Sequence, residues 1–225
     1  MNSAIKKLFA AIVVAAGLQP VSGQVFKPVD YTALNVDISF NPTAYDTLLS
    51  RFENGDPSLD VTDMSTVYYG FVCSPGYNPD VDCHDVVTAL EESRWDDAYD
   101  LAVKALEVIP VSLDMNTKAV IAATNSTDPA ANIHVARLSA RVDMLVMAIL
   151  SSGLGTIPEA PFFVTSYDDA LSLVKGAFGA TAILGRSSVG PVDAIKFTLD
   201  DTGREHILYF NTYHNTKQKN TNSSI

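Results

Sequence analysis

The sequence predicts an α+β protein: a helical N-terminal region packed with a small C-terminal antiparallel sheet that carries one helix. Two observations support this fold class. Apolar residues recur at helical spacing from Tyr31 to Leu150, whereas the short segments after Pro158 are rich in aromatic and β-branched residues. Between them lies Ser-Ser-Gly-Leu-Gly, residues 151–155, where the pattern changes. Helices followed by strands favour α+β over an alternating parallel sheet.

The first residues predict a secretory signal peptide, residues 1–23. Lys6 and Lys7 precede an apolar run that ends at Leu18, and small residues follow at the spacing of a cleavage site. An apolar run of about 11 residues is too short to cross a bilayer. No cysteine follows the predicted cleavage site to carry a lipid. We therefore expect an exported protein, periplasmic or secreted, with no lipid anchor and no transmembrane segment in the mature chain.

The composition is acidic, with a formal net charge of −11 at pH 7 that becomes −13 if the two leader lysines, Lys6 and Lys7, are removed. An acidic surface repels phosphate backbones, so we expect neither nucleic acid nor an anionic lipid surface as a partner. Solubility alone would also account for this charge.

Capping residues and prolines predict where the helices of the front half begin, and glycine or proline breaks predict where they end. The predicted helices are 31–38, 42–53, one capped by Asp60 or Thr62 that ends before Ser74, one beginning near His84, one from Trp95 to before Pro110, 113–123 and 129–150.

Ala98, Ala102 and Ala105, ahead of Pro110, have the spacing of the second helix of a tetratricopeptide unit. Small residues at these positions let two antiparallel helices approach closely. No clean repeat of about 34 residues is present. We therefore predict a tetratricopeptide-like helical region over residues 24–153 rather than a true repeat array.

A small α+β region is predicted over residues 154–214, followed by a disordered polar tail, 215–225. Its expected strands are "PFFVT", "ATAIL", "AIKFTL" and "HILYFNTY", with a helix from Asp168 to Lys175 between the first two. Glycine-containing and acidic turn segments separate these strands.

The stretch "YYGFVCSPGYNPDVDC", residues 68–83, contains both cysteines of the chain. In an oxidising compartment, Cys73 and Cys83 would most simply form a disulfide across the glycine- and proline-rich loop. A loop this short contributes about 2–3 kcal/mol in the loop-entropy description. The alternative is that both residues remain thiols.

The same stretch provides a candidate binding surface, formed by Tyr69, Tyr77 and Asn78. Aromatic rings with polar tips on a rigid loop suit the recognition of peptides or sugars. On a helix, the adjacent Tyr68 and Tyr69 point about 100° apart, so we expect only one of them to enter the core. The alternative is that Tyr77 and Asn78 only fold the loop.

Three segments together, "STVYYGFVCSPGYNP", "AILSSGLGTIPEAPFFVTSYDDAL" and "HILYFNTY", resemble domain-of-unknown-function family 4919, exported proteins of gut-dwelling Bacteroidetes. The resemblance covers roughly residues 26–213 and implies helices in front and a small mixed sheet behind. It implies no activity and no site residues. The chain departs from the family pattern at Leu154, where an acid is usual between the two glycines, and at Cys73, where an apolar or aromatic residue is usual.

No catalytic constellation, metal site or cofactor motif is predicted. The four histidines lack metal-ligand spacing, and the paired acids fall at predicted helix starts or turns, where they occur without any function. Trp95 is either a core anchor or a platform for a sugar ring. We therefore expect a non-enzymatic binding or scaffolding module for a protein or peptide partner in the envelope. The alternatives are a small exported enzyme or binder acting on polysaccharide or peptide, and a subunit of an envelope complex.

Overall fold

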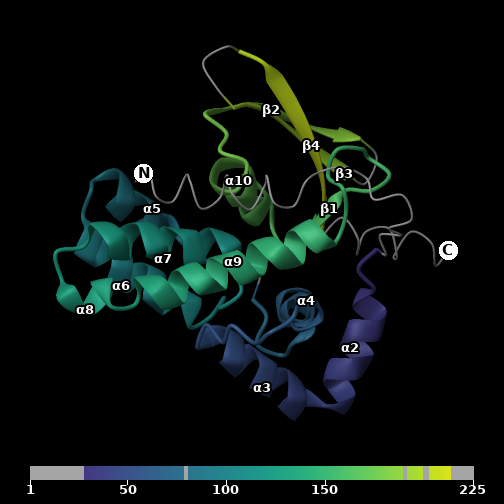
Figure 1. The fold of residues 1–225 in the computed structure, drawn as a ribbon, viewed down its shortest axis with the longest axis horizontal. Helices are drawn as coiled ribbons and strands as arrows, with labels where there is room; N and C mark the ends of the chain where they lie inside the picture. The colour runs from purple at the N-terminus through teal and green to yellow at the C-terminus, as the bar shows by residue number, and fades with distance from the viewer. Residues whose placement is uncertain (1–27, 79–80, 190–191, 200–202, 214–225) are drawn as a thin grey trace. The chain divides into compact units, whose positions relative to one another are not determined.

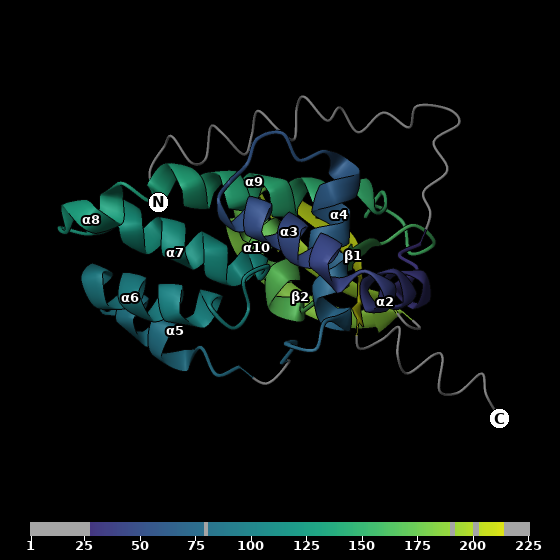
Figure 2. The same cartoon turned by 90° about the horizontal axis from the view of Figure 1, so that it is seen from below.

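The computed structural model describes residues 28–78, 81–189, 192–199 and 203–213 (Figures 1 and 2). The predicted signal peptide, residues 1–23, and the predicted tail, residues 215–225, lie outside them. The described chain divides into two compact units: a helical unit, Asp30–Ala148, and a sheet unit that begins at Ile149.

The helical unit contains helices that follow one another along the chain (Figure 1). They are α2 (Tyr31–Phe40), α3 (Pro42–Glu53), α4 (Val61–Gly70), the 3-10 helix η1 (Phe71–Cys73), α5 (His84–Glu91), α6 (Trp95–Leu106), α7 (Leu113–Asn125), α8 (Pro129–Asn132) and α9 (Val135–Ser151), whose last residues belong to the sheet unit.

Side chains cap several helices where the sequence predicts a start. Asp30 accepts from the backbone N–H groups of Thr32 and Ala33, both at 3.0 Å. Asp60, rather than Thr62, caps α4, and it forms a reciprocal capping box with Asp63. These contacts satisfy N–H groups that the helix itself leaves unpaired.

The single helix predicted over residues 129–150 is wrong, because the structure divides it into α8 and α9. The backbone N–H of His134 bonds the carbonyl of Ala131, three residues back, at 3.1 Å. This tighter turn ends α8, and α9 starts at Val135.

Helices α5, α6 and α7 pack against one another through a buried cluster of Ala89, Ala98 and Ala122. Alanines at a helix contact let the backbones approach closely. Many helical folds pack in this way, so the tetratricopeptide-like character of the region stays a prediction.

Helix α4 is buried on more than one side, and this corrects the expectation that only one of Tyr68 and Tyr69 enters the core. Four consecutive residues, Val67 to Gly70, are buried. Helix α4 packs against α2 and α3, and the hydroxyl of Tyr69 donates to the carbonyl of Ala148 in α9 at 3.3 Å. A helix with neighbours on several sides can bury two adjacent side chains that point 100° apart.

The sheet unit holds four strands and one helix in its described residues: β1 (Phe162–Val164), α10 (Tyr167–Gly176), β2 (Ala182–Val189), β3 (Val192–Thr198) and β4 (Glu205–Thr212). The strand order is β1-β4-β3-β2. Strands β2, β3 and β4 pair antiparallel, whereas β1 pairs with β4 in parallel, Phe162 opposite Phe210.

The sheet is therefore mixed, and the prediction of a purely antiparallel sheet is wrong at β1. The physical reason is the connection. Helix α10 and the β2–β3 hairpin separate β1 from β4 along the chain, so β4 meets β1 without a hairpin turn and can run in the same direction.

The segment from Ser151 to Pro161 is fixed by backbone contacts within the sheet unit. The N–H groups of Leu154 and Gly155 both donate to the carbonyl of Ala160 at 2.9 Å, and Gly155 accepts from Tyr209 N–H at 2.7 Å. A Cβ on Gly153 would lie 2.1 Å from the carbonyl oxygen of Pro161. This close approach of the backbone requires glycine at position 153.

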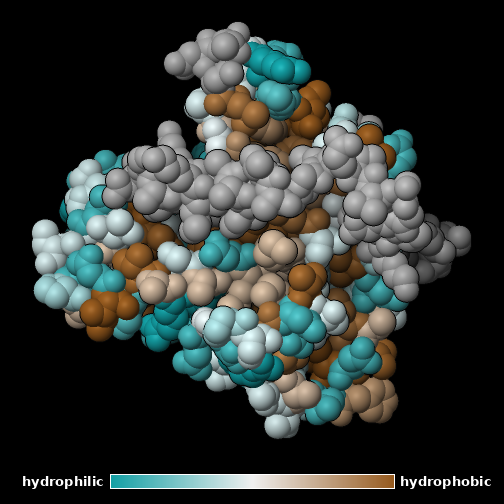
Figure 3. Space-filling view, viewed as in Figure 1, coloured by the Kyte–Doolittle hydropathy of each residue, from teal (hydrophilic) through white to brown (hydrophobic). Residues whose placement is uncertain are grey.

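None of the helices in the described part of the chain combines the length and apolar character that crossing a membrane requires. In the space-filling view, apolar side chains lie among polar ones (Figure 3). The most exposed large apolar side chain of the described residues is Phe40 at the end of α2, which is 87% exposed.

Candidate functional site

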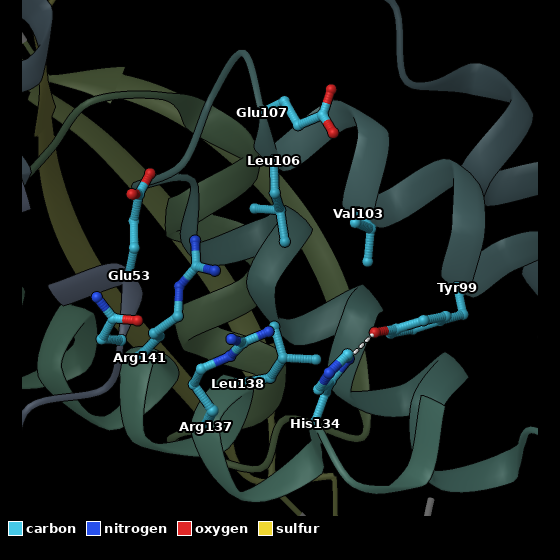
Figure 4. A pocket seen from close by; sticks show the side chains of 10 residues that line it. Glu53, Tyr99, Val103, Leu106, Glu107, His134, Arg137, Leu138 and Arg141 are labelled. Atoms are coloured by element: carbon cyan, nitrogen blue, oxygen red, sulfur yellow. Dashed lines mark hydrogen bonds between the residues drawn. The ribbon is translucent and has the colours of Figure 1, made fainter. Parts of the chain in front are cut away.

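A pocket of about 340 Å³ lies within the helical unit (Figure 4). Its lining comes from three places: Glu53 and Asn54 at the end of α3; Tyr99, Val103, Leu106 and Glu107 from α6 and its cap; and His134, Arg137, Leu138 and Arg141 from α9 and the residue before it. This volume is at the lower end of the range for pockets that bind small molecules.

One wall of the pocket is apolar and follows from helix periodicity. Tyr99, Val103 and Leu106 recur at spacings of four and three on α6, so they share one face of that helix. Leu138 of α9 completes the apolar lining. This part of the pocket suits a hydrocarbon group.

The opposite wall is cationic. His134, Arg137 and Arg141 are spaced by three and four residues, which places them along one face of the helical turns from His134 onward. Figure 4 shows the guanidinium groups of Arg137 and Arg141 on the pocket side of the helix. Arg137 and Arg141 thus place two positive charges on this wall, in a chain whose formal net charge is −11.

Two of the lining residues are joined by a hydrogen bond between the Tyr99 hydroxyl and His134 Nδ1, which lie 2.5 Å apart (Figure 4). Burial raises the pKa of Tyr99, although the nearby Arg137 opposes the shift. The phenol is therefore protonated near neutral pH and can donate to the imidazole.

Arg141 is the most deeply placed charge of the pocket, with only 7% of its surface exposed. Its Nη2 donates to the carbonyl of Pro110 at 2.8 Å, and its guanidinium carbon lies 5.1 Å from the centre of the Phe52 ring. Its Nε is buried and has no hydrogen-bond partner among the described residues. Burial lowers the pKa of Arg141 to about 10, and the like charge of Arg137 adds to this effect.

Arg137 lies nearer the surface, and its aliphatic stem packs against the end of α3. Gly55 follows that helix with φ of +68°, and a Cβ there would lie 3.3 Å from Arg137 Cγ. The N–H groups of Gly55 and Asp56 bond the carbonyls of Phe52 and Arg51, which is a Schellman C-cap. The C-terminal turn of α3 thus positions the Arg137 side chain.

Two acids, Glu53 and Glu107, belong to the lining and are exposed to solvent. In the described part of the chain, neither forms an ion pair with Arg137 or Arg141 within 4.0 Å. Glu53 still acts on Arg141 at longer range and opposes the lowering of its pKa.

The three residues of the predicted binding surface, Tyr69, Tyr77 and Asn78, differ in their exposure to solvent. Tyr69 is only 2% exposed and its ring packs edge-on to Tyr31 and Tyr68. Tyr77 is half-buried against Phe71, with 6.1 Å between ring centres, and Asn78 is exposed. A binding role for the three residues together stays a prediction, and Tyr69 contributes to the core.

Cys73 and Cys83 are both thiols in the structure, which does not show the predicted disulfide. Cys73 Sγ lies 3.7 Å from the carbonyl oxygen of Tyr31, as a thiol donor to that oxygen. The loop between the two cysteines includes residues 79 and 80, which lie outside the described residues. The disulfide stays a prediction.

A second pocket of about 300 Å³ surrounds the start of α6 and includes the half-buried Trp95. Asp96 beside it accepts from the backbone N–H of Thr127 at 3.1 Å and from its hydroxyl at 2.9 Å, as well as from the Ser126 hydroxyl. The hydrogen bonds of Ser126 and Thr127 lower the pKa of Asp96. This carboxyl group is therefore an anionic acceptor rather than a proton donor.

Sequence reasoning did not single out Tyr99, His134, Arg137 or Arg141. Arg141 directly precedes Val142, which together with Leu138 belongs to the apolar residues that recur at helical spacing in this segment. An arginine next to apolar residues on a helix is the signal in the sequence that could have indicated a buried charge at this position. No group of three or more metal-ligating side chains is found in the part of the chain that the structure describes.

The family model described as Domain of unknown function (DUF4919) matches residues 35–221 of the chain. No curated protein and no solved structure matches the chain.

Proposed function

The chain belongs to the family Domain of unknown function (DUF4919), and from the geometry of its own residues we propose that it is a non-enzymatic binding module for a protein or peptide partner. The single observation that carries this proposal is the pocket between α6 and α9, where an apolar wall faces a cationic one. A peptide segment offers both kinds of group. A small pocket with convergent polar groups is the usual form of a binding site.

The acids at the second pocket support binding over catalysis. Hydrolysis of a glycosidic bond needs a carboxylic acid with a raised pKa that can protonate the leaving group. The pKa of Asp96 is lowered instead, and Asp97 is paired with Arg94 at 2.6 Å.

The proposal includes the place where the protein works. A signal peptide over residues 1–23 would export it to the periplasm or beyond, and the partner would then be an envelope or extracellular protein. The tetratricopeptide-like spacing of Ala98, Ala102 and Ala105 supports this role, because helix pairs of that type stack to leave a concave face that suits a peptide or partner. Mass analysis of the native protein tests export, since its first residue should be Gln24.

Affinity capture from envelope and culture-fluid extracts tests the binding role, with two matched variants. Val103 lines the pocket and is 36% exposed, whereas Val108 is 42% exposed and lies outside the lining. We expect Val103→Glu to lose the enriched partner and Val108→Glu to keep it. A partner that both variants retain would exclude this pocket as the contact.

One observation favours a second candidate function, that of a polysaccharide binder. Trp95 lies in a pocket whose other lining residues are polar, and an indole ring beside hydroxyl and carboxylate groups suits a sugar. A glycan array with the native chain and Trp95→Ala tests this candidate. A glycan bound by the native chain and lost by the variant would favour it over the peptide-binding role.

A further inference from the structure

We infer that the cationic wall of the α6–α9 pocket binds the C-terminal carboxylate of a peptide whose last side chain is apolar. This inference rests on the proposed function and names the group that enters the pocket. It depends on three features: an incompletely paired buried arginine, a second arginine beside it, and an apolar wall of suitable size.

The first feature is Arg141, whose side chain lines the pocket with more than nine-tenths of its surface buried. One guanidinium nitrogen, Nη2, is satisfied by a carbonyl, and Nε lacks a partner among the described residues. A buried cation is costly unless it is paired and hydrogen-bonded. An anion in the pocket would supply the opposite charge that the described residues do not place in contact with it.

The second feature is the closeness of Arg137. The two guanidinium groups repel each other, which disfavours the charged form of Arg141, while Glu53 acts on Arg141 in the opposite direction and more strongly. A carboxylate between them relieves this repulsion. Planar guanidinium groups match the planar geometry of a carboxylate through paired N–H···O bonds.

The third feature is the apolar wall, and together with the nearby acids it indicates which kind of anion would bind. Glu53 and Glu107 at the pocket and the net charge of −11 oppose a ligand with two or more negative charges. A carboxylate carries one. Val103, Leu106 and Leu138 provide an apolar surface near it that suits a single aliphatic side chain.

Calorimetry on the full chain tests the inference with three probes. They are the peptide acetyl-Ala-Ala-Ala-Ala-Leu with a free carboxylate, the same peptide with a C-terminal amide, and octanoate. We expect the free peptide to bind at least tenfold more tightly than its amide, because charge-assisted hydrogen bonds are the strong ones. We expect octanoate to bind more weakly than the free peptide, because it lacks a peptide backbone.

Two variants assign the effect to the arginines. Arg137 is exposed, so Arg137→Gln should fold normally and weaken binding of the free peptide about tenfold without changing binding of the amide. Arg141→Lys keeps a charge but cannot form paired bonds, and a thermal melt shows whether it folds. Lys104, exposed on α6 and outside the lining, provides the control Lys104→Gln, which should bind both peptides as the native chain does.

Each outcome has a defined meaning. Equal affinity for the free peptide and the amide overturns carboxylate recognition and leaves the proposed pocket intact. Octanoate bound as tightly as the free peptide overturns the peptide terminus as the source. The proposed function fails separately, when Val103→Glu retains a captured partner. Weakening of the free peptide by Arg137→Gln, and not by Lys104→Gln, supports the inference.

Discussion

The side chains of Asn116 and Arg141 donate to one acceptor, the carbonyl oxygen of Pro110, at 2.9 and 2.8 Å. Asn116 belongs to α7 and Arg141 to α9, so this carbonyl joins two helices through the connection that precedes α7. Each donor also has a buried polar atom with no partner among the described residues, Asn116 Oδ1 and Arg141 Nε. The deepest wall of the pocket therefore depends on a polar contact inside an otherwise apolar core.

We expect Asn116→Ala to lower the free energy of unfolding by about 1–3 kcal/mol, because it removes the buried Nδ2 bond to the carbonyl of Pro110 and the part-buried one to the carbonyl of Ser112. Asn125 on the same helix makes an equivalent bond to the carbonyl of Ile121, at an exposed position. Asn125→Ala should therefore cost less than about 0.5 kcal/mol. Urea denaturation of both variants measures the difference, and equal costs would contradict a special role for the buried contact.

Gly55→Ala should lower stability by about 1–2 kcal/mol, since φ at this residue is +68° and a side chain there is strained. The new methyl group would also press on Arg137 Cγ and shift the arginine. Gly76→Ala, in an exposed turn where a Cβ meets nothing within 4 Å, is the control and should leave stability unchanged or slightly raised. Thermal melts of the two variants make the comparison.

Gly153→Ala should be among the most damaging small substitutions in the sheet unit, with a cost above about 4 kcal/mol. The added Cβ would lie 2.1 Å from the carbonyl oxygen of Pro161, which is backbone and cannot rotate away. In the same unit, Gly185→Ala meets nothing within 4 Å and should have little effect. Soluble yield and melting temperature distinguish the two variants. A Gly153→Ala protein as stable as the native chain would show that the backbone at Pro161 can move away from residue 153 and would contradict this prediction.

Asp56 should make stability depend on pH in the acid range. Hydrogen bonds from Ser58 and from Arg51 lower its pKa to about 2, below the ordinary value of about 3.9. Because the folded-state pKa is depressed, the stabilisation is present above about pH 4 and is lost as pH falls toward 2. An NMR titration of the carboxyl group measures the pKa. Urea midpoints of the native chain and Asp56→Asn should differ near pH 5 and converge near pH 2.

Tyr69 should behave as a core residue in mutation. Tyr69→Phe removes the donor to the Ala148 carbonyl and should cost about 1 kcal/mol. Tyr69→Ala should cost about 3–5 kcal/mol, as expected for loss of a buried aromatic ring. Tyr77→Ala, at a half-buried position, should cost less. A partner lost only by Tyr77→Ala, with stability retained, would support a contact at the loop instead of a folding effect.

The sequence predicts most elements of this fold because their signals are local. Asp30 and Asp60 precede helices and cap them, and the four predicted strands overlap the four observed ones. Local signals do not report how many neighbours an element has. The periodicity of α4 indicates one buried face, whereas Tyr68 and Tyr69 are both buried because helices pack on more than one side of it.

The pocket could not be predicted for a related reason. The sequence places Arg137 and Arg141 on a helix, but only the fold brings residues of α3, α6 and α9 together around one cavity. Strand direction is equally non-local: β1 runs parallel to β4 because of the chain between them, and "PFFVT" alone contains no information on direction.

The position of β4 in the sheet has a consequence for biosynthesis. In the described residues, β1 pairs only with β4, and β4 is the last strand of the chain. Phe162 therefore has no sheet partner while the ribosome is still adding the residues before Glu205. The pairing of β1 can therefore be completed only after Glu205–Thr212 has emerged from the ribosome, so this sheet closes later in synthesis than the order of its first strands along the chain suggests.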